Sequence, residues 1–199
     1  MKSIYEERPW LKLYPSGINP EVNFPNKSVG EVFDDTVAKW KNRSAIIFYG
    51  KTISFKELKD KVDRFATSLA ALGIRKGDRL ALLLLNTPEY IISFYAAVKI
   101  GAVVTPISPV YVSSEIKHQL EDSGAESIIC QDILYESVEQ SGVKLKHVIL
   151  TNVADSLPKL TKFMGKSILR GVYQKMAAPA PEIFLKEGFY NLHELIEKS

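Results

Sequence analysis

Cysteine is almost absent from this sequence, since Cys130 is the only one in 199 residues. A single cysteine excludes a disulfide framework within the chain and a cysteine-rich zinc site. Histidine is also scarce, and His118, His147 and His193 show no metal-ligand spacing. We expect a protein without a metal centre of its own, and the low cysteine content is compatible with a reducing compartment.

Long apolar runs are missing as well. No run approaches the roughly 20 residues that a helix needs to cross a bilayer. The N-terminal stretch MKSIYEERPW is charged and lacks the apolar segment of a signal peptide. We therefore expect a cytoplasmic protein.

Positive charge is concentrated in one segment. Residues Leu157 to Met176 carry five basic side chains and no acid, so the net charge of +3 leaves −2 for the rest of the chain. This local distribution argues against a generally basic, nucleic-acid-binding surface. Four of these cations fall on one stripe of a helix with 100° per residue: Lys159, Lys162, Lys166 and Arg170.

The basic stripe has two interpretations. It could rest on an anionic membrane surface, where each cation contributes roughly 1 kcal/mol. It could equally be the solvated face of a helix whose opposite, aliphatic side chains pack on the domain. The second interpretation is favoured, because burying an aliphatic side chain contributes about 1.5–3 kcal/mol.

The stretch from Ile74 to Tyr111 predicts a β-strand, a helix and a second β-strand. An apolar run from Leu80 to Leu85 is typical of a strand buried on both faces. Asn86 is a candidate helix cap, and Gly101 is expected to end the helix. The run from Ala102 to Thr105 then predicts a strand parallel to the first. We expect this βαβ unit to form the centre of the sheet.

The rest of the chain divides into three parts. Residues 1–27, the lead-in, are rich in proline and predict an extended segment whose apolar side chains pack across the domain. Residues 28–154 predict helices that begin at Ser28, Ser54 and Ser113 or Ser114. They also predict a hairpin with its turn at Gly50-Lys51 and strands at 127–130 and 147–150. Residues 155–199 predict helices and no strand, so they are expected to be a helical appendage.

The alternation of strands and helices predicts an α/β fold with a mostly parallel sheet flanked by helices. The inner face of the helix after Ser28 is expected to carry Val29, Val32, Phe33, Val37 and Trp40. Glu89 and Glu115 lie in first helical turns, where the helix macrodipole explains them. Cys130 and the three histidines are expected to have structural roles.

Three blocks of sequence resemble one known family. They are TISFKEL from Thr52, GDR followed by LALLLLNTPEY from Gly77, and KIGAVVTPISPVY from Lys99. In this order and spacing they are similar to the N-terminal part of adenylate-forming (AMP-binding) enzymes. The lead-in block RPWLKLYPSG and the block FYNLHEL resemble microbial long- or medium-chain fatty acid–CoA ligases.

The resemblance implies that a complete enzyme activates a fatty acid with ATP and Mg²⁺ and transfers the acyl group to CoA. The family's Ser/Thr/Gly-rich phosphate loop, ribose-binding Asp and catalytic lysine have no counterpart in these residues. This chain alone is therefore expected to be inactive and to need the remainder of the enzyme as its partner. The alternatives are a non-catalytic interaction module and one half of a split enzyme, and an exposed sheet edge predicts self-association.

One ligand contact is implied by the resemblance. Ser108, Pro109, Val110 and Tyr111 correspond to a loop that lies beside CoA in some acyl-CoA synthetases. The alternative is a proline-rich turn that ends a strand. The basic residues that could bind CoA phosphates are missing after Cys130, where the chain reads QDILYESVEQ, so the turn is favoured.

Overall fold

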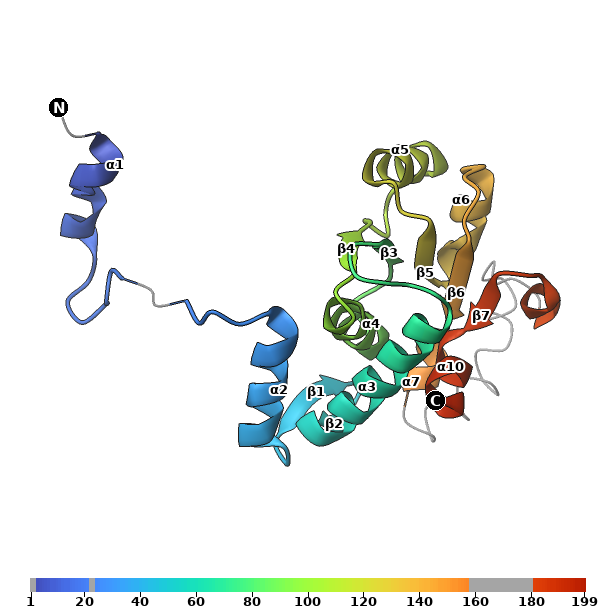
Figure 1. Cartoon of the computed structure of the whole chain (residues 1–199), viewed down its shortest axis with the longest axis horizontal. Coiled ribbons are helices and arrows are strands. Elements are labelled where there is room, and N and C mark those ends of the chain that lie inside the picture. Colours follow the sequence, from blue (N-terminus) through green and yellow to red (C-terminus); the bar gives the residue numbers. More distant parts are fainter. Residues whose placement is uncertain (1–2, 22–23, 158–180) are drawn as a thin grey trace.

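The computed structural model describes residues 3–21, 24–157 and 181–199. Its body is a parallel sheet with helices on both faces, and a short antiparallel hairpin lies beside it (Figure 1). The predicted α/β fold is confirmed.

Five strands form the sheet in the order β4-β3-β5-β6-β7, and every neighbouring pair is parallel. They are β3 (Arg79–Leu83), β4 (Val103–Pro106), β5 (Ser127–Gln131), β6 (His147–Thr151) and β7 (Phe189–Asn191). The predicted βαβ unit is present as β3, α4 and β4. Its central position was wrong, because β5 occupies the centre and β4 is an edge strand, where Pro106 breaks no interior ladder.

Helices cover the two faces of the sheet separately. On one face, Leu80, Leu82 and Ile129 pack against α3 (Phe55–Ala71), α4 (Pro88–Lys99) and α10 (Leu192–Lys198). On the other face, Ala81, Leu83 and Ile128 pack against α5 (Ser113–Ser123) and α6 (Tyr135–Gln140). Every residue of β5 and β6 is buried, as a continuous apolar run in a parallel sheet requires.

Side-chain caps fix where two of the helices begin. The Ser28 side chain accepts from the Glu31 amide at the start of α2 (Val29–Trp40), and Ser54 does the same for Glu57 in α3, so both predicted capping boxes are confirmed. Two other predicted caps were off by one or two residues. Thr87 occupies the cap of α4, because Pro88 is its first residue, and Val112 occupies the cap of α5.

The predicted hairpin is present as β1 (Ser44–Phe48) and β2 (Lys51–Ser54). Its turn is Tyr49-Gly50, one residue earlier than expected, because Lys51 pairs with Phe48. Both turn residues have positive φ, 48° for Tyr49 and 79° for Gly50. Tyr49 thus adopts a left-handed conformation that the sequence does not favour, and this explains the shifted prediction.

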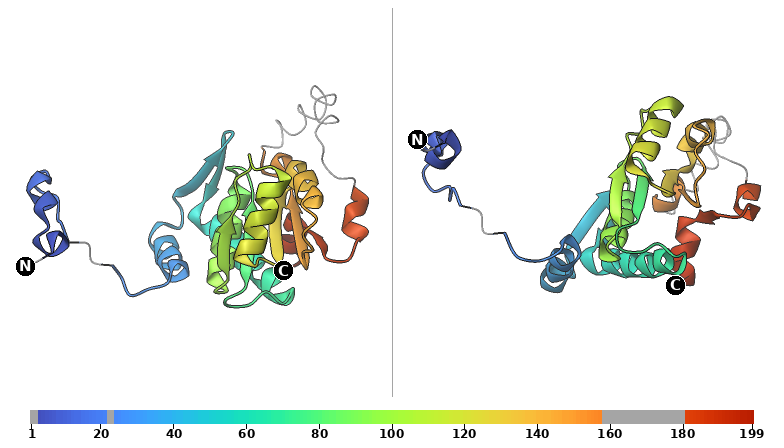
Figure 2. Two further views of the ribbon diagram at one scale, coloured as in Figure 1. Left: turned by 90° about the horizontal axis from the view of Figure 1, so that it is seen from above. Right: turned by 45° about the horizontal axis from the view of Figure 1, so that its top comes forward.

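The lead-in differs from its prediction in two ways. It contains α1 (Ile4–Glu7), which Ser3 and Glu6 cap, and the 3₁₀ helix η1 (Pro9–Leu13). It also projects away from the body in all views instead of packing across it (Figures 1 and 2). Leu13 and Phe24 are each 85% exposed, so their apolar character indicates no burial within this chain.

The last described segment is part of the core rather than an appendage. It consists of the 3₁₀ helix η3 (Pro181–Leu185), β7 and α10, and it follows α7 (Val153–Ser156) and the residues 158–180 outside the description. Strand β7 pairs with β6, and Leu192 and Ile196 of α10 join the main core. The prediction of no strand was wrong, since three residues are too few to show an alternating pattern.

Candidate functional site

The carboxyl ends of all five strands lie on one edge of the sheet, because the strands are parallel. The connection from β3 runs through α4 on one face, whereas the connection from β5 runs through η2 (Asp132–Leu134) and α6 on the other. Neighbouring strands whose connections leave to opposite faces form a topological switch point, where α/β proteins bind ligands. The residues after β3 and β5 are therefore the candidate site.

Buried polar side chains gather at this edge. Five of them are at least 94% buried and have a side-chain oxygen without a hydrogen-bond partner in the described part of the chain: Thr87, Glu89, Ser93, Gln131 and Thr151. Gln131 and Thr151 follow Ile129 and Ile149 by two residues, so they face the same side as α4 and α10. The polar layer thus lies beneath those two helices.

Glu89 is the most deeply placed charged group of the layer. Its side chain is fully buried at the start of α4, and its Oε1 accepts a hydrogen bond from the Ser156 hydroxyl. The Nε2 atom of His193, on α10, lies 3.3 Å from the same oxygen. Burial raises the pKa of the Glu89 carboxyl, but the contacts with His193 and Ser156 outweigh burial and hold that pKa below its usual value.

The order of these three groups limits their chemistry. In a Ser–His–acid triad the histidine lies between the nucleophile and the acid, whereas here the carboxylate lies between the other two. Ser156 is itself 96% buried and bonded to an acceptor, so it is not activated as a nucleophile. Glu89 instead holds α7 and α10 against α4.

Two further polar pairs stabilise the ends of β5 and β6. The Gln131 side chain donates to the Thr151 carbonyl at 3.0 Å, and the Asn152 amide donates to Asp132. Carboxylate and amide oxygens of this kind accept hydrogen bonds, whereas the hydroxyl groups of Thr87, Ser93 and Thr151 can donate or accept. Among the described residues, the layer contains no Lys or Arg that would bind the phosphates of a nucleotide.

The predicted CoA wall, Ser108 to Tyr111, lies at the same edge after β4. It forms a tight turn in which the Tyr111 amide donates to the Ser108 carbonyl at 3.1 Å, and Val110 is 85% exposed. Tyr111 lines a shallow hollow of about 570 Å³ with Glu115, His118 and Asp122 of α5. Two carboxylates and no Lys or Arg line this hollow in the described chain, so it does not fit the phosphates of CoA.

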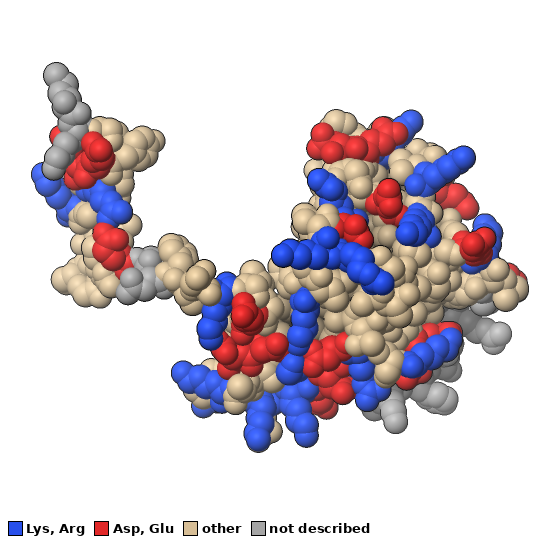
Figure 3. Space-filling view, in the orientation of Figure 1, with Lys and Arg blue, Asp and Glu red and all other residues tan. Residues whose placement is uncertain are grey.

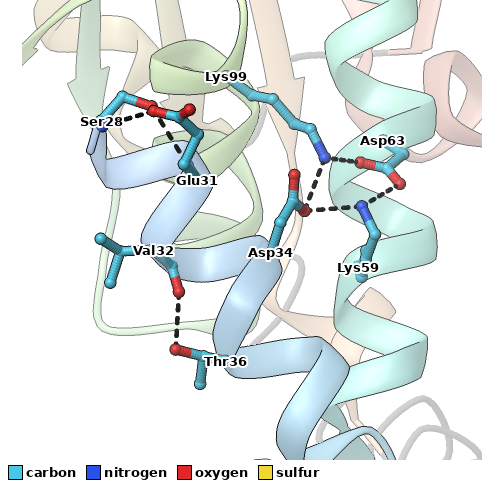
Figure 4. Close-up of polar contacts among 8 residues, drawn as sticks. All are labelled: Ser28, Glu31, Val32, Asp34, Thr36, Lys59, Asp63 and Lys99. Atoms are coloured by element: carbon cyan, nitrogen blue, oxygen red, sulfur yellow. Dashed lines mark hydrogen bonds and ion pairs between the residues drawn. The ribbon is translucent and has the colours of Figure 1, made fainter. Parts of the chain in front are cut away.

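A second polar cluster lies away from the edge and joins three helices (Figure 4). Asp34 of α2 and Asp63 of α3 each pair with both Lys59 of α3 and Lys99 of α4. Burial lowers the pKa of Lys59, but Asp34 and Asp63 outweigh it and hold that pKa above its usual value. All four charges are mutually satisfied, so the cluster stabilises the helices rather than forming a reactive site.

The remaining candidates have structural roles or lie outside the described residues. Cys130 is buried, and burial raises the pKa of its thiol, which keeps it unreactive. No group of three or more potential metal ligands occurs among the described residues. The basic stripe at Lys159, Lys162, Lys166 and Arg170 lies outside the described ranges, so it stays a prediction. None of the described helices is long and apolar enough to cross a membrane.

Sequence reasoning missed the Glu89 node, which is the contact of the Glu89 carboxylate with Ser156 and His193. Glu89 is in a first helical turn, as predicted, but its contacts come from Ser156 and His193, which are distant in sequence. The neighbouring NTPEY block gave a partial signal, because a Glu that follows Pro at a helix start after a buried strand lies close to the sheet edge. The sequence contains nothing that pairs Glu89 with a particular histidine.

Comparison with known proteins identifies the family. A family model described as "AMP-binding enzyme" matches residues 33–182. The long-chain-fatty-acid–CoA ligase of Bacillus subtilis is 33% identical over 175 residues, which cover 85% of this chain and 30% of that protein. The corresponding ligase of Escherichia coli O157:H7 is 32% identical over 170 residues, 81% of this chain and 30% of that protein.

Solved structures agree with this result. A long-chain-fatty-acid–CoA ligase from Archaeoglobus fulgidus superposes with a TM-score of 0.63 and 25% identity over 66% of this chain and 29% of its own. An anthranilate CoA ligase in complex with anthranoyl-AMP gives a TM-score of 0.68 over 88% of this chain and 29% of its own, and its 18% identity supports the fold alone. The chain spans about 30% of the length of the curated relatives it matches. It belongs to the adenylate-forming, AMP-binding enzyme family.

Proposed function

We propose that this chain is the N-terminal α/β part of a fatty acid–CoA ligase. The complete enzyme would activate a fatty acid with ATP and Mg²⁺ to an acyl-adenylate and then transfer the acyl group to CoA. The single observation that carries the proposal is the similarity to the Bacillus subtilis ligase over most of this chain. This part contributes a sheet, its carboxyl edge and the Glu89 node that fixes α10.

No reaction step is assigned to the described residues. Their carboxyl edge carries Glu89, Gln131 and Thr151, and the hollow beside Tyr111 carries Glu115 and Asp122. These groups do not fit ATP or CoA phosphates, which need cations or free backbone amides. The chain alone is therefore proposed to be inactive, with the remainder of a longer enzyme as its partner.

Two measurements test this proposal. The first is the reading frame beyond Ser199, which should continue into a Ser/Thr/Gly-rich loop that contains a lysine. A stop codon there would favour a non-catalytic module or one half of a split enzyme. The second is ATP–pyrophosphate exchange with palmitate, which the purified 199-residue chain should not catalyse.

A protein translated through the downstream frame supplies the positive control. It should form a fatty acyl-CoA from palmitate, ATP and CoA when Mg²⁺ is present. Exchange by the 199-residue chain at a comparable rate would contradict the proposal that the catalytic residues lie outside this chain.

The site of action proposed for the complete enzyme is the cytoplasm, with weak contact to anionic membrane through the basic stripe. Sedimentation with vesicles of phosphatidylcholine, with and without phosphatidylserine, tests the membrane contact. Pelleting that requires phosphatidylserine at low salt supports it, and no lipid-dependent pelleting removes it.

A further inference from the structure

The amino edge of the sheet, opposite the candidate site, carries a small polar pocket. It lies where β3, β5 and β6 begin, beside the turn that follows α3, and has a volume of about 150 Å³. We call it the amino-edge pocket. Its polar and charged lining side chains are Asp78, Arg79, Glu126, Ser127, Lys146 and His147.

His147 is the buried group of this pocket. It is the first residue of β6 and is 8% exposed, yet neither of its ring nitrogens has a hydrogen-bond partner in the described part of the chain. A buried polar group without a partner costs free energy, so such groups are normally bonded to protein or to a ligand. A ligand in the amino-edge pocket would supply the missing partner.

The charge state of His147 determines what it can offer. Burial and the nearby charge of Lys146 lower the pKa of His147, and they outweigh the Leu72 carbonyl, which raises it. The ring is therefore neutral at neutral pH. A neutral imidazole provides one N–H donor and one acceptor nitrogen.

Two cations line the same pocket. Arg79 is the first residue of β3 and Lys146 immediately precedes β6, and neither forms a salt bridge with another described residue. The Lys146 amide donates to the Glu126 carbonyl at 2.7 Å, which fixes this turn beside the start of β5. Together with the His147 ring, these cations provide N–H donors around one small space. Donors of this kind bind the oxygens of an anion.

Two carboxylates in the wall limit which anion fits. Asp78 Oδ2 already accepts a hydrogen bond from the Arg75 amide at 2.7 Å. Glu126 forms no salt bridge in the described chain, although Arg79 and Lys146 line the same pocket. A carboxylate repels an anion that has acceptor oxygens alone, such as sulfate, but it accepts a hydrogen bond from an anion that carries a proton. The pocket therefore favours a protonated oxyanion.

The surrounding surface does not select anions by itself. Figure 3 shows basic and acidic side chains intermixed over the visible face of the body, with no large area of one sign. Anion binding by a general positive field is therefore not expected here. Selection must come from the particular side chains of the pocket.

The size of the pocket limits the ligand as well. A volume of about 150 Å³ corresponds to about five water molecules at roughly 30 Å³ each. One tetrahedral oxyanion with five heavy atoms fits this space, whereas a nucleotide is much larger.

We propose that the amino-edge pocket binds inorganic phosphate. Arg79, Lys146 and the N–H group of His147 donate to the phosphate oxygens, and Glu126 accepts from the phosphate hydroxyl. Inorganic phosphate keeps at least one proton near neutral pH, whereas a phosphate monoester has largely lost its own. Binding involves no covalent step and no part of the proposed ligase function, so the two proposals can fail separately.

Nuclear magnetic resonance of the full chain with ¹⁵N-labelled histidine tests the proposal. Inorganic phosphate is titrated near neutral pH at constant ionic strength, and His147→Gln identifies the ring signals of His147 by their loss. These signals should move with phosphate and reach saturation. The signals of His118 and His193, which do not line the pocket, should stay in place. Sulfate and methyl phosphate at the same ionic strength should bind at least roughly tenfold more weakly.

Variants of the two cations have a matched control. Lys146→Gln and Arg79→Gln change exposed residues and should each raise the dissociation constant of phosphate roughly tenfold. Lys144→Gln removes an exposed lysine of the same segment that does not line the pocket, so it should leave binding unchanged. Circular dichroism establishes that each variant is folded, and Arg79→Gln serves if Lys146→Gln is unstable.

A variant of the carboxylate tests why phosphate is preferred. Glu126→Gln removes the negative charge but keeps an acceptor oxygen. Sulfate should then bind more tightly than it does to wild type, and the preference for phosphate over sulfate should fall by roughly tenfold or more.

Four results would each overturn the proposal. The first is that the His147 signals stay unchanged at every soluble concentration of phosphate. The second is that sulfate moves these signals as much as phosphate does in wild type. The third is that Lys146→Gln and Arg79→Gln bind phosphate no more weakly than Lys144→Gln. The fourth is that Glu126→Gln keeps the full preference for phosphate.

Discussion

Glu89 is a buried carboxylate that stays ionised because Ser156 and His193 contact it. Its folded pKa lies below that of an ordinary Glu, so it stabilises the fold above the ordinary pKa. That contribution is lost as the pH falls through the lower, folded value. The residue therefore links acid stability to the position of α10.

Replacing Glu89 by Gln should lower the free energy of unfolding at pH 7 by about 1.5–3 kcal/mol, the usual value for a hydrogen bond to a charged group. The difference from wild type should shrink as the pH falls through the folded pKa of Glu89, since wild type then loses the charge as well. Urea denaturation over a series of acid pH values measures this. Glu194→Gln, which removes a surface pair with Lys198, is the control and should cost less than about 1 kcal/mol. A difference for Glu89→Gln that grows in acid would contradict this account.

Gly188 precedes β7 in a left-handed conformation that favours glycine. Its φ is +84°, and a Cβ atom would lie 2.7 Å from the backbone oxygen of Lys146. Gly188→Ala should destabilise the chain by more than about 2 kcal/mol, because a backbone clash adds to the left-handed strain. Gly142→Ala has the strain without the clash, since no atom lies within 4 Å, and should cost about 1–2 kcal/mol. If urea denaturation gave the same loss of unfolding free energy for both variants, the structure would relieve the clash at Gly188 without cost.

At the scale of elements, helix α2 depends on the cluster that joins it to α3 and α4. Asp34→Asn should lower the free energy of unfolding by about 1 kcal/mol, since these side chains are 26–42% exposed and water weakens their pairs. The effect should diminish in 1 M NaCl, and hydrogen exchange should accelerate in α2 first. Asp35→Asn removes only the pair with Lys27 and is the matched control. Similar exchange in both variants would argue against a special role for Asp34.

Most elements were predictable because each has a local cause. The capping boxes at Ser28 and Ser54 and the apolar runs of β3, β5 and β6 depend on neighbouring residues. Strand β7 was not predictable, since its three residues become a strand only by pairing with β6. The Tyr49-Gly50 turn was missed for a similar reason, because the register with β2 imposes positive φ on Tyr49.

The candidate site was less predictable than the fold. Its edge follows from the parallel strand order, but the contact of Glu89 with Ser156 and His193 depends on tertiary packing. Exposure was also misjudged for Val29 and Val32, because helical periodicity marks an apolar face and not what covers it.

At the scale of the whole molecule, the body should be nearly independent of the lead-in. Within one chain the hydrogen bonds that join them are confined, among the described residues, to Lys27 and Asp35. Deleting residues 1–24 should change the free energy of unfolding by less than about 0.5 kcal/mol. Urea denaturation at a concentration where the chain is monomeric measures this. A larger loss would show that the lead-in packs on its own body.

The Glu89 node has a consequence for how this fold can accept inserted sequence. Ser156 and His193 lie on either side of residues 158–180, and both contact the same carboxylate. The two segments that flank this stretch, α7 and α10, are therefore both held against α4 by one carboxylate. A peptide tag or a reporter domain inserted between them would therefore leave both attachments to Glu89, and the sheet beside them, in place.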